Sequence, residues 1–255
     1  MNTYATATAA DVKALRALKT RAERQSQGRY LAEGEHLCGE AIREAQAISL
    51  IVQSGKETQY AQYLQSGLPV QVLSAKAFDM ISDTRTPQGI AALCHLPDHV
   101  TATALGPRIV ALNGVQDPGN VGTILRTMDA AGFTGLLLDT SSADPFSPKA
   151  LRATMGAIFR LPVCVCDILS DQLRALSGYD IIAGSLDGAP FYQRQPSGER
   201  VCLLIGSEGA GLSPQVAAMA TQRVRLPMPG RAESLNAAIA ASIMMYDFVR
   251  EWEQP

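Results

Sequence analysis

The sequence predicts an α/β fold in two domains, the second of which contains a parallel sheet with helices on both faces. Short apolar runs alternate with segments of helical periodicity along most of the chain, as in strands joined by helices. With 255 residues, 47% hydrophobic and 18% charged, the chain is long enough for two small domains with buried cores. The stretch LPDHVTATALGP, residues 96–107, has no clear period, two prolines and a glycine, which is typical of a linker. We therefore predict domains at residues 1–97 and 107–255.

The first domain is expected to be a small α/β unit. Apolar runs of strand length occur at residues 29–34, 48–53, 70–73 and 89–94. Segments with helical spacing separate these runs at residues 35–47, 56–66 and 75–82.

A strongly basic segment begins this domain. Residues 11–29 contain six Lys and Arg side chains against two carboxylates, a local charge of +4 in a chain whose net charge is −2. Val12, Leu15 and Leu18 repeat at helical spacing, so the pattern taken alone favours a helix whose cations face solvent. A basic patch on an acidic body can also steer a polyanion to one face of a protein. Nucleic-acid binding by this segment therefore needs support from elsewhere in the sequence.

The second domain continues the alternation of strands and helices. Strands are expected near residues 109–113, 135–139, 163–166, 180–184, 201–205 and 223–226. A long helix at residues 234–251, capped by Ser234, closes the chain. Alternation of this kind predicts parallel strands with helices on both faces of the sheet.

The stretch DPGNVGTILRT, residues 117–127, joins the first strand of this sheet to a helix. Its glycines lack the GxGxxG spacing of a dinucleotide-binding turn, which argues against that function. Residues 117–120 suit a turn and helix cap, and Gly132 suits the helix end. The stripe that packs on the sheet consists of Val121, Ile124, Leu125 and Met128. Arg126 then lies on the other side of the helix, where an arginine is usually solvated.

Two later strands also run into loops with unusual backbone properties. In VCLLIGSEGAGLS a strand leads directly to three glycines and Glu208. Further on, Pro227 and Pro229 interrupt another strand. Because prolines carry no backbone N–H, neighbouring backbone groups at Leu226 and Met228 are left for a ligand. Open α/β sheets bind ligands at the carboxyl ends of their strands, so three such segments together indicate a site.

The composition argues against several other functions. The apolar stretch AAIAASIMMY is about half the length needed to cross a bilayer, and MNTYATATAA has neither a basic start nor an apolar signal core. We therefore expect a cytoplasmic protein without a membrane partner. The five cysteines include no CxxC pair, so buried thiols are expected rather than a zinc site or disulfides. His36, His95 and His99 are expected to be structural or surface residues.

Three segments of the second domain resemble the motifs of the SpoU-TrmH family of RNA ribose methyltransferases, the 2'-O-methylating branch of the SPOUT superfamily. In the family's order, they are NGVQDPGNVGTILRTMDAAG, LLIGSEGAGLS and LPMPGRAESLNAAIAAS. SSADPFSPKALRATMGAIFRLPV is similar to the family's segment between the first two motifs. GRYLAEGEHLCGEAI and SDTRTPQGIAAL are similar to the substrate-binding domain that many members carry, so the resemblance covers nearly the whole chain.

This resemblance implies a catalytic domain with a deep trefoil knot, an exception to the usual avoidance of knots in proteins. It also implies S-adenosylmethionine as the cofactor, held in the knot, and no metal. The implied cofactor contacts are Leu204, Ile205, Gly206, Leu226, Met228, Ser234, Leu235 and Ala237, with backbone groups that bind adenine. The residues implied to lie on the RNA side and to carry the catalysis are Asn120, Arg126, Glu208, Ser234 and Asn236.

Ribose methylation fits these residue types. Methyl transfer from a sulfonium to a hydroxyl is an in-line displacement, and most of the gain comes from holding oxygen, methyl and sulfur in a row. A guanidinium stays charged in proteins and is a weak general base. We therefore expect Arg126 to bind the phosphate beside the target ribose and to favour the developing alkoxide, although the family's arginine is often described as the base.

An RNA substrate changes the interpretation of the basic segment, since Lys19, Arg21 and Arg24 become candidate phosphate contacts. The resemblance further implies a homodimer with the last helix near the interface. Ribosomal RNA is favoured over transfer RNA as the substrate. The alternatives are a transfer-RNA ribose methyltransferase, an enzyme that methylates a base nitrogen, and a catalytically inert RNA-binding protein. The presence of Asn120 and Arg126 argues against the last two.

Overall fold

The computed structural model describes residues 4–253 of the chain. Residues 1–3, part of the amino-terminal stretch discussed above, and residues 254–255 lie outside the described range. The chain forms two compact units, of which the first comprises the chain up to Asp98 together with Phe146–Phe159. The second comprises His99–Pro145 and the chain from Arg160 onward. None of the helices within residues 4–253 is long and apolar enough to cross a membrane.

The first unit is built on a five-stranded sheet with the strand order β1-β4-β3-β5-β2, in which β3 is parallel to β4 and antiparallel to β5. Its strands are β1 (Ala5–Thr6), β2 (Arg29–Glu33), β3 (Ala47–Gln53), β4 (Val70–Leu73) and β5 (Ile90–His95). Its helices are α1 (Ala9–Ala17), α2 (Arg21–Gln27), α3 (Glu35–Arg43), α4 (Ala61–Leu64), α5 (Ala75–Ile81), α7 (Pro148–Thr154) and the 3-10 turn η2 (Ala157–Phe159). The small α/β unit predicted from the sequence is confirmed.

Two differences in this unit have local causes. The helix expected at residues 56–66 is confined to α4, because its first residues form turns and no side chain caps its start. The strand β1 was not expected, since two residues are too few to show a pattern. The apolar stripe of the basic segment is confirmed, because Val12, Leu15 and Leu18 pack with Phe78 and Ile81 of α5 in one core.

The second unit is a six-stranded sheet in which every neighbouring pair of strands is parallel, in the order β11-β9-β10-β6-β7-β8. Its strands are β6 (Arg108–Asn113), β7 (Gly135–Asp139), β8 (Val163–Cys166), β9 (Asp180–Pro190), β10 (Val201–Gly206) and β11 (Gln222–Arg225). Its helices are α6 (Pro118–Ala130), α8 (Leu169–Arg174), α9 (Pro214–Ala217) and α10 (Ala237–Trp252), with 3-10 turns η1 (Ala102–Ala104) and η3 (Phe191–Gln193).

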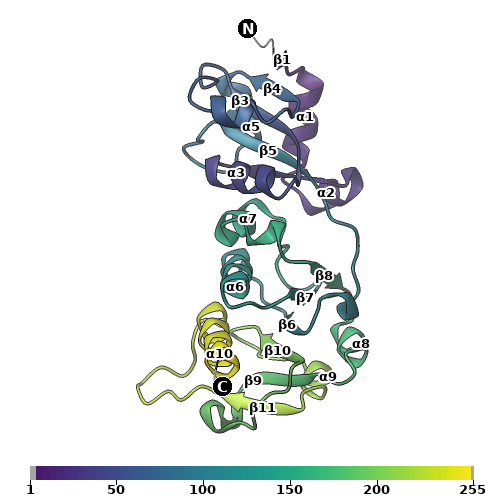
Figure 1. Cartoon of the computed structure of the whole chain (residues 1–255), viewed down its shortest axis with the longest axis vertical. Coiled ribbons are helices and arrows are strands. Elements are labelled where there is room, and N and C mark those ends of the chain that lie inside the picture. Colours follow the sequence, from purple (N-terminus) through teal and green to yellow (C-terminus); the bar gives the residue numbers. More distant parts are fainter. Residues whose placement is uncertain (1–3, 254–255) are drawn as a thin grey trace. The chain divides into compact units, whose positions relative to one another are not determined.

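Helices cover both faces of this sheet (Figure 1). Ile109 of β6 packs in one cluster with Leu169 and Leu173 of α8. Its neighbour Val110 is equally buried but points to the opposite face, because successive strand residues alternate. On that face α6 and α10 pack against each other, and α10 also packs against β10. The predicted parallel sheet with helices on both faces is confirmed.

Two elements of the second unit depart from the expected boundaries. The strand β9 continues to Pro190, well past the expected end at residue 184, because its last residues pair with Val224 and Arg225 of β11. The last helix begins at Ala237 rather than at residue 234. Its cap is therefore Asn236, and the prediction that Ser234 caps this helix is wrong. The long connection before it extends away from the sheet (Figure 1).

Candidate active site

The helix α6 brings the first motif to the carboxyl edge of the sheet. The Asp117 carboxylate accepts the backbone N–H of Gly119 at 2.5 Å, and Pro118 occupies the first helical position. At the other end Gly132 has a φ of +71°, a conformation that favours glycine. The predicted start and end of this helix are both confirmed. Asn120 is thereby placed in the first helical turn.

Three of the predicted catalytic side chains are joined by hydrogen bonds. Asn120 Nδ2 donates to Glu208 Oε1, and Asn236 Nδ2 donates to Asn120 Oδ1 at 3.0 Å. Asn236 Oδ1 in turn accepts the backbone N–H groups of Ala238 and Ile239 at 3.0 and 3.2 Å, which fixes the orientation of its amide. The loops that follow β6, β10 and β11 therefore meet at one cluster.

The loop after β10 is tightly folded at its base. A Cβ atom on Gly206 would lie 2.5 Å from the Gly211 carbonyl oxygen and 2.6 Å from Leu212 N. Ser207 and Gly211 exchange backbone hydrogen bonds of 3.1 and 3.0 Å across the loop. Gly206 is therefore required by the loop that carries Glu208, because any side chain would push that loop away.

A cavity of about 450 Å³ opens beside this cluster, a size usual for small-molecule sites. It is lined by most of the residues expected to bind the cofactor, namely Ile205, Gly206, Leu226, Met228, Ser234, Leu235 and Ala237. The remaining one, Leu204, is fully buried inside β10. Glu208 also lines the cavity, so the hydrogen-bonded cluster and the cavity share a wall.

Arg126 and Ser234 lie outside the hydrogen-bonded cluster. Arg126 is exposed on the same side of α6 as Thr123 and Ala130, as the helical spacing predicts. Its guanidinium has no hydrogen-bond or ion-pair partner within residues 4–253. Ser234, which does not cap the helix, is exposed at the cavity.

Sequence reasoning missed part of the cavity wall. The additional residues include Gly184, Ser185, Leu186 and Asp187 of β9, Arg223 and Arg225 of β11, and Ala240 and Met244 of α10. A hydrogen bond from Ser185 lowers the pKa of Asp187. The backbone N–H of Asp187 and the charge of Arg223 lower it further. The stretch GSLDG follows an apolar strand as the other motifs do, and this signal would have pointed to Asp187.

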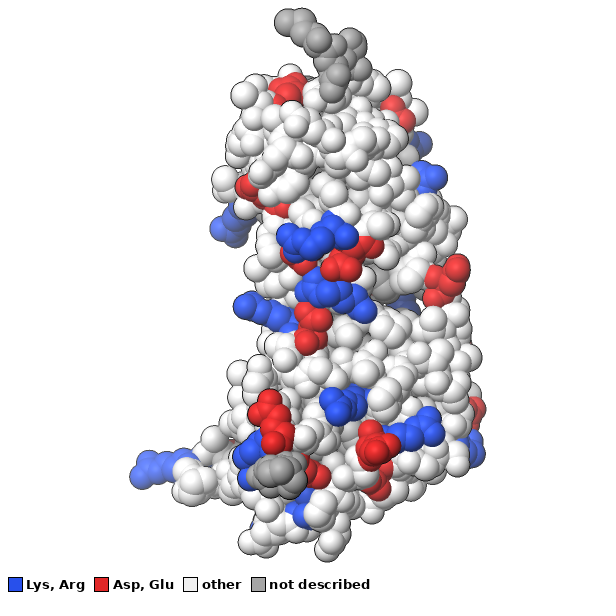
Figure 2. Space-filling view, viewed as in Figure 1, with Lys and Arg blue, Asp and Glu red and all other residues white. Residues whose placement is uncertain are grey.

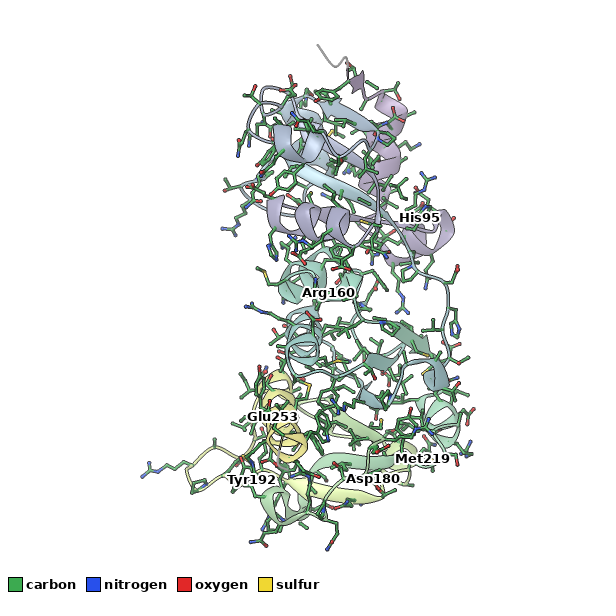
Figure 3. The ribbon with its side chains drawn as sticks, viewed as in Figure 1. His95, Arg160, Asp180, Tyr192, Met219 and Glu253 are labelled. Carbon is green, nitrogen blue, oxygen red and sulfur yellow. The ribbon has the colours of Figure 1, made fainter. Side chains whose placement is uncertain are left out.

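The remaining titratable residues of interest lie away from the cavity. His95, at the end of β5, is exposed (Figure 3), and so is His99. His36 Nε2 lies 3.2 Å from the Met155 carbonyl oxygen. All five cysteines are buried and unpaired, as expected, and burial raises the pKa of Cys202 to about 12.

The basic segment occupies α1, α2 and the start of β2. Arg24 is buried, and its Nη1 donates to the Leu18 and Lys19 carbonyls at 2.7 and 2.9 Å, where α1 ends. Lys19 is half-buried and donates to the Ser82 carbonyl. Arg21 is half-buried as well. On the face shown in Figure 2, cationic and anionic side chains are intermixed.

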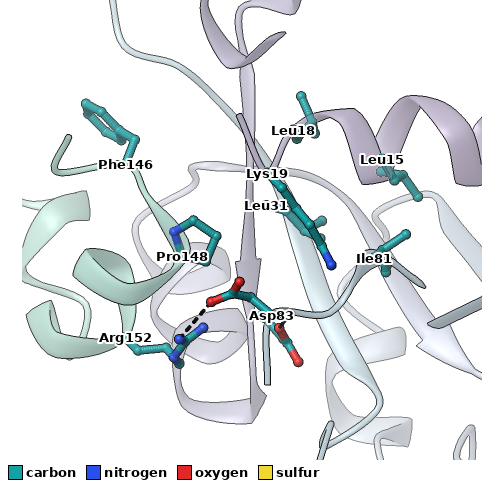
Figure 4. A pocket seen from close by; sticks show the side chains of 10 residues that line it. Leu15, Leu18, Lys19, Leu31, Ile81, Asp83, Phe146, Pro148 and Arg152 are labelled. Carbon is teal, nitrogen blue, oxygen red and sulfur yellow. Dashed lines mark hydrogen bonds and ion pairs between the residues drawn. The ribbon is translucent and has the colours of Figure 1, made fainter. Parts of the chain in front are cut away.

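A small pocket in the first unit is a packing feature rather than a ligand site. It lies among residues of α1, β2, the end of α5 and α7 (Figure 4). Its volume of about 10 Å³ holds at most one water molecule. Across it, Arg152 Nη2 of α7 donates to Asp83 Oδ2 at 3.0 Å. Together with the Tyr30 and Phe146 rings, 5.1 Å apart, this ion pair attaches residues 146–159 to the first unit.

Comparisons with known proteins agree with this geometry. Residues 107–246 match the model of the SpoU rRNA methylase family, and residues 9–92 match the MRM3-like substrate binding domain. The chain is 38% identical over 237 residues to the 23S rRNA (guanosine(2553)-2'-O)-methyltransferase RlmP of Bacillus subtilis strain 168, which covers 92% of this chain and 94% of that enzyme.

Solved structures match the fold over almost its whole length. An AdoMet-bound rRNA methyltransferase from Sinorhizobium meliloti superposes with a TM-score of 0.84 at 31% identity and covers 98% of each chain. The SpoU methyltransferase AviRb from Streptomyces viridochromogenes, in complex with AdoMet, superposes with a TM-score of 0.85 at 25% identity, covering 96% of this chain and 98% of AviRb. Since the family model alone spans more than half of the sequence, this chain belongs to the SpoU rRNA methylase family.

Proposed function

We propose that this chain methylates a ribose 2'-hydroxyl of ribosomal RNA, with S-adenosylmethionine as the methyl donor. The observation that carries the proposal is the cavity, where residues of the second and third motifs surround one space beside the cluster of Asn120, Glu208 and Asn236. The relative RlmP, by its name, methylates a guanosine 2'-oxygen in 23S rRNA. The match to a substrate binding domain favours RNA contacts from the first unit.

The cavity suits S-adenosylmethionine in both size and chemistry. Ile205, Leu226 and Met244 offer an apolar wall for adenine, next to backbone groups of the proline-interrupted segment. Asp187 and Glu208 are carboxylates that can accept hydrogen bonds from ribose hydroxyls or an ammonium group. When bound, the cofactor supplies a methyl group activated by its positively charged sulfur.

The protein's own side chains would then orient the RNA. Asn120 and Asn236 hold the Glu208 carboxylate in one position, and these polar groups can bind the target ribose. Arg126 is exposed and unpartnered within residues 4–253, so its planar guanidinium is available to bind an RNA phosphate at two oxygens. We infer that orientation and charge stabilisation, rather than proton abstraction by Arg126, provide most of the rate.

The structure refines the proposed RNA contacts of the first unit. Lys13 and Arg16 of α1 are exposed, while Arg21 and Lys19 are half-buried and remain candidates. Arg24 was expected to contact phosphate, but its guanidinium is buried against the end of α1. We propose that Arg24 supports the basic segment and that its exposed neighbours contact RNA.

Three further parts of the proposal concern the whole enzyme. We propose a homodimer in which α10 lies near the interface, because Ile239, Ile243 and Tyr246 are exposed along this helix. We propose a trefoil knot. In its support, the loop after β10 and the segment before α10 both hydrogen-bond to Asn120 of α6, through Glu208 and Asn236. A substrate in ribosomal RNA also favours a cytoplasmic enzyme.

Mapping of ribose methylation in total RNA tests the substrate. A strain that lacks this gene should lose one or a few 2'-O-methyl groups in large-subunit ribosomal RNA, and the wild-type gene should restore them. Loss in a transfer RNA instead would establish the alternative substrate. An unchanged methylation map, together with no methyl transfer by the purified protein, would favour the inert RNA-binding protein.

The cofactor site can be tested with two glycine-to-alanine substitutions. Gly206→Ala should lower the affinity for S-adenosylmethionine by roughly tenfold or more, because the new methyl group displaces the Gly211–Leu212 backbone. Gly230→Ala is the control, since a Cβ there meets no protein atom within 4 Å and Gly230 does not line the cavity. Calorimetry on the full chain measures both. Equal affinity of Gly206→Ala and wild type would argue against this cavity as the cofactor site.

A further inference from the structure

A buried carboxylate lies at the end of β7, next to the candidate site but outside the predicted residues. Asp139 is only 6% exposed. Its oxygens accept hydrogen bonds from Asn113 Nδ2 at 2.6 Å, Gly114 N at 3.1 Å, and Ser142 N and Oγ at 2.9 and 2.7 Å. Burial by itself would raise the pKa of Asp139, but the hydrogen bonds from Ser142, Gly114 and Asn113 outweigh it and lower the pKa. The carboxylate therefore stays ionised and acts only as an acceptor.

The hydrogen-bond partner Asn113 closes the loop that carries Glu208. The backbone of Asn113 pairs with Gly206 in the β6–β10 ladder, where this loop begins. The side-chain Oδ1 of Asn113 accepts the backbone N–H of Ser213 at 2.7 Å, where the loop ends. One residue thus holds both ends of the segment that includes Glu208.

The arrangement works only with one orientation of the Asn113 amide. If the amide turned over, its NH₂ group would face the N–H of Ser213, and both groups would be donors. Asp139 prevents this because a carboxylate can pair only with the NH₂ side of the amide. The charged acceptor on β7 therefore determines whether the loop after β10 is held at its far end.

We propose that Asp139 is a positioning residue that, through Asn113, holds the loop of residues 206–213 in the conformation that forms the cavity wall and presents Glu208. The proposal rests on the proposed function of the cavity as the cofactor site. It concerns the geometry of binding and transfer, because Asp139 does not line the cavity. Its effect should appear first in the use of S-adenosylmethionine.

An exchange of the two side chains tests the orientation argument. In Asp139→Asn, the new amide cannot accept the hydrogen bonds of Gly114, Ser142 and Asn113 together, so either Gly114 and Ser142 or Asn113 loses its partner. The double variant Asn113→Asp with Asp139→Asn exchanges the two groups. The new amide at residue 139 then donates to the new carboxylate at residue 113, and that carboxylate still accepts Ser213 N. Every hydrogen bond of the network can then form again.

Steady-state methylation by the full chain supplies the readout. Asp139→Asn should raise the KM for S-adenosylmethionine by roughly tenfold, as expected for the loss of a charge-assisted hydrogen bond, and leave the KM for RNA unchanged. The double variant should recover most of this loss. The control is Asp180→Asn, a carboxylate at the opposite edge of the same sheet that accepts Gly198 N at 2.7 Å (Figure 3). It should behave like the wild type.

A second variant tests the proposal even if Asp139→Asn fails to fold. Ser213→Pro removes the N–H that Asn113 accepts, together with a hydroxyl that makes no capping hydrogen bond to α9, and the φ of −63° at Ser213 suits proline. It should raise the KM for S-adenosylmethionine as well. An unchanged KM in Ser213→Pro, or a double variant no better than Asp139→Asn, would overturn the proposal. A wild-type chain that neither binds S-adenosylmethionine nor methylates RNA would instead contradict the proposed function, before any variant is compared.

Discussion

Arg126 lies outside the cluster of Asn120, Glu208 and Asn236, and its guanidinium has no partner among the described residues. If it binds an RNA phosphate, Arg126→Lys should keep the affinity for S-adenosylmethionine and lose roughly a hundredfold in single-turnover rate, since lysine lacks the planar fork. Arg126→Ala should be slower still. Arg174→Lys, at an exposed arginine of α8, is the control and should retain the wild-type rate. A wild-type rate in Arg126→Ala would mean that Arg126 takes no part in methyl transfer.

The pH dependence of the same reaction distinguishes a base from a phosphate clamp. A base at residue 126 would make the wild-type rate rise with pH relative to that of Arg126→Met, since methionine cannot take up a proton. A clamp predicts parallel profiles, because only the ribose hydroxyl then changes its ionisation. Single-turnover rates between about pH 6 and pH 10 measure the difference.

The elements α1 and α2 present cations in two different settings. Lys13 and Arg16 are exposed and Arg21 is half-buried, so their joint replacement by alanine should flatten the salt dependence of RNA binding by roughly one unit of slope per lost phosphate contact. The affinity for S-adenosylmethionine should stay the same. Arg24→Ala should instead lower the melting temperature, since it removes two hydrogen bonds to the end of α1. Filter binding over a range of salt concentrations measures this slope. A wild-type slope in the triple variant would contradict the assignment.

The helix α10 is attached to the segment after β9 by a buried ion network. Arg194, whose side chain is 4% exposed, pairs with Asp247 at 2.5 Å and Glu251 at 2.6 Å, and its guanidinium lies over the rings of Phe191 and Phe248. Arg194→Met should cost about 3 kcal/mol in the free energy of unfolding, because Glu251 loses its cation and Asp247 keeps only the exposed Arg250. Urea denaturation measures this loss.

An exposed pair of the same kind provides the control for the network. Arg174 and Asp171 are 2.7 Å apart but 65% and 57% exposed. Arg174→Met should therefore change the free energy of unfolding by no more than about 1 kcal/mol. Equal losses in Arg194→Met and Arg174→Met would show that burial does not set the strength of the network.

At the scale of the whole molecule, α10 has apolar side chains on two sides. Met244, Met245 and Phe248 are buried, whereas Ile239, Ile243 and Tyr246 are 50%, 37% and 53% exposed. If the exposed side lies in a dimer interface, the double variant Ile239→Glu with Ile243→Glu should sediment as a monomer and keep its fold. Ile168→Glu, at an isoleucine that is 59% exposed elsewhere, should leave the dimer intact. A monomeric wild type in analytical ultracentrifugation would contradict the proposed assembly.

The sequence predicted the features that leave a pattern in neighbouring residues, and it missed the features that depend on residues far apart in the chain. The strands β6, β7 and β10 are apolar along most of their length because both faces are buried, so their positions were visible as runs such as RIVALN. Whether Ser234 or Asn236 caps α10 could not be predicted from neighbouring residues. Asn236 also donates to Asn120, which is far away in the sequence. Asp139 was missed for the same reason. It ends an ordinary apolar run, and only the fold brings Asn113 to it.

The assignment of residues 146–159 to the first unit has a consequence for modularity. The chain passes between the two units three times, near residues 98, 145 and 159, so the substrate-binding unit is not a continuous piece of sequence. A single proteolytic cut between residues 99 and 106 would release residues 1–98 from the second unit, whereas residues 146–159 would stay covalently joined to it. A chimaera could exchange only residues 1–98 with those of a relative. Arg152 of the original α7 would then face the relative's residue in place of Asp83. Transplanting RNA specificity between members of this family therefore requires that the inserted helix be exchanged with the domain that it completes.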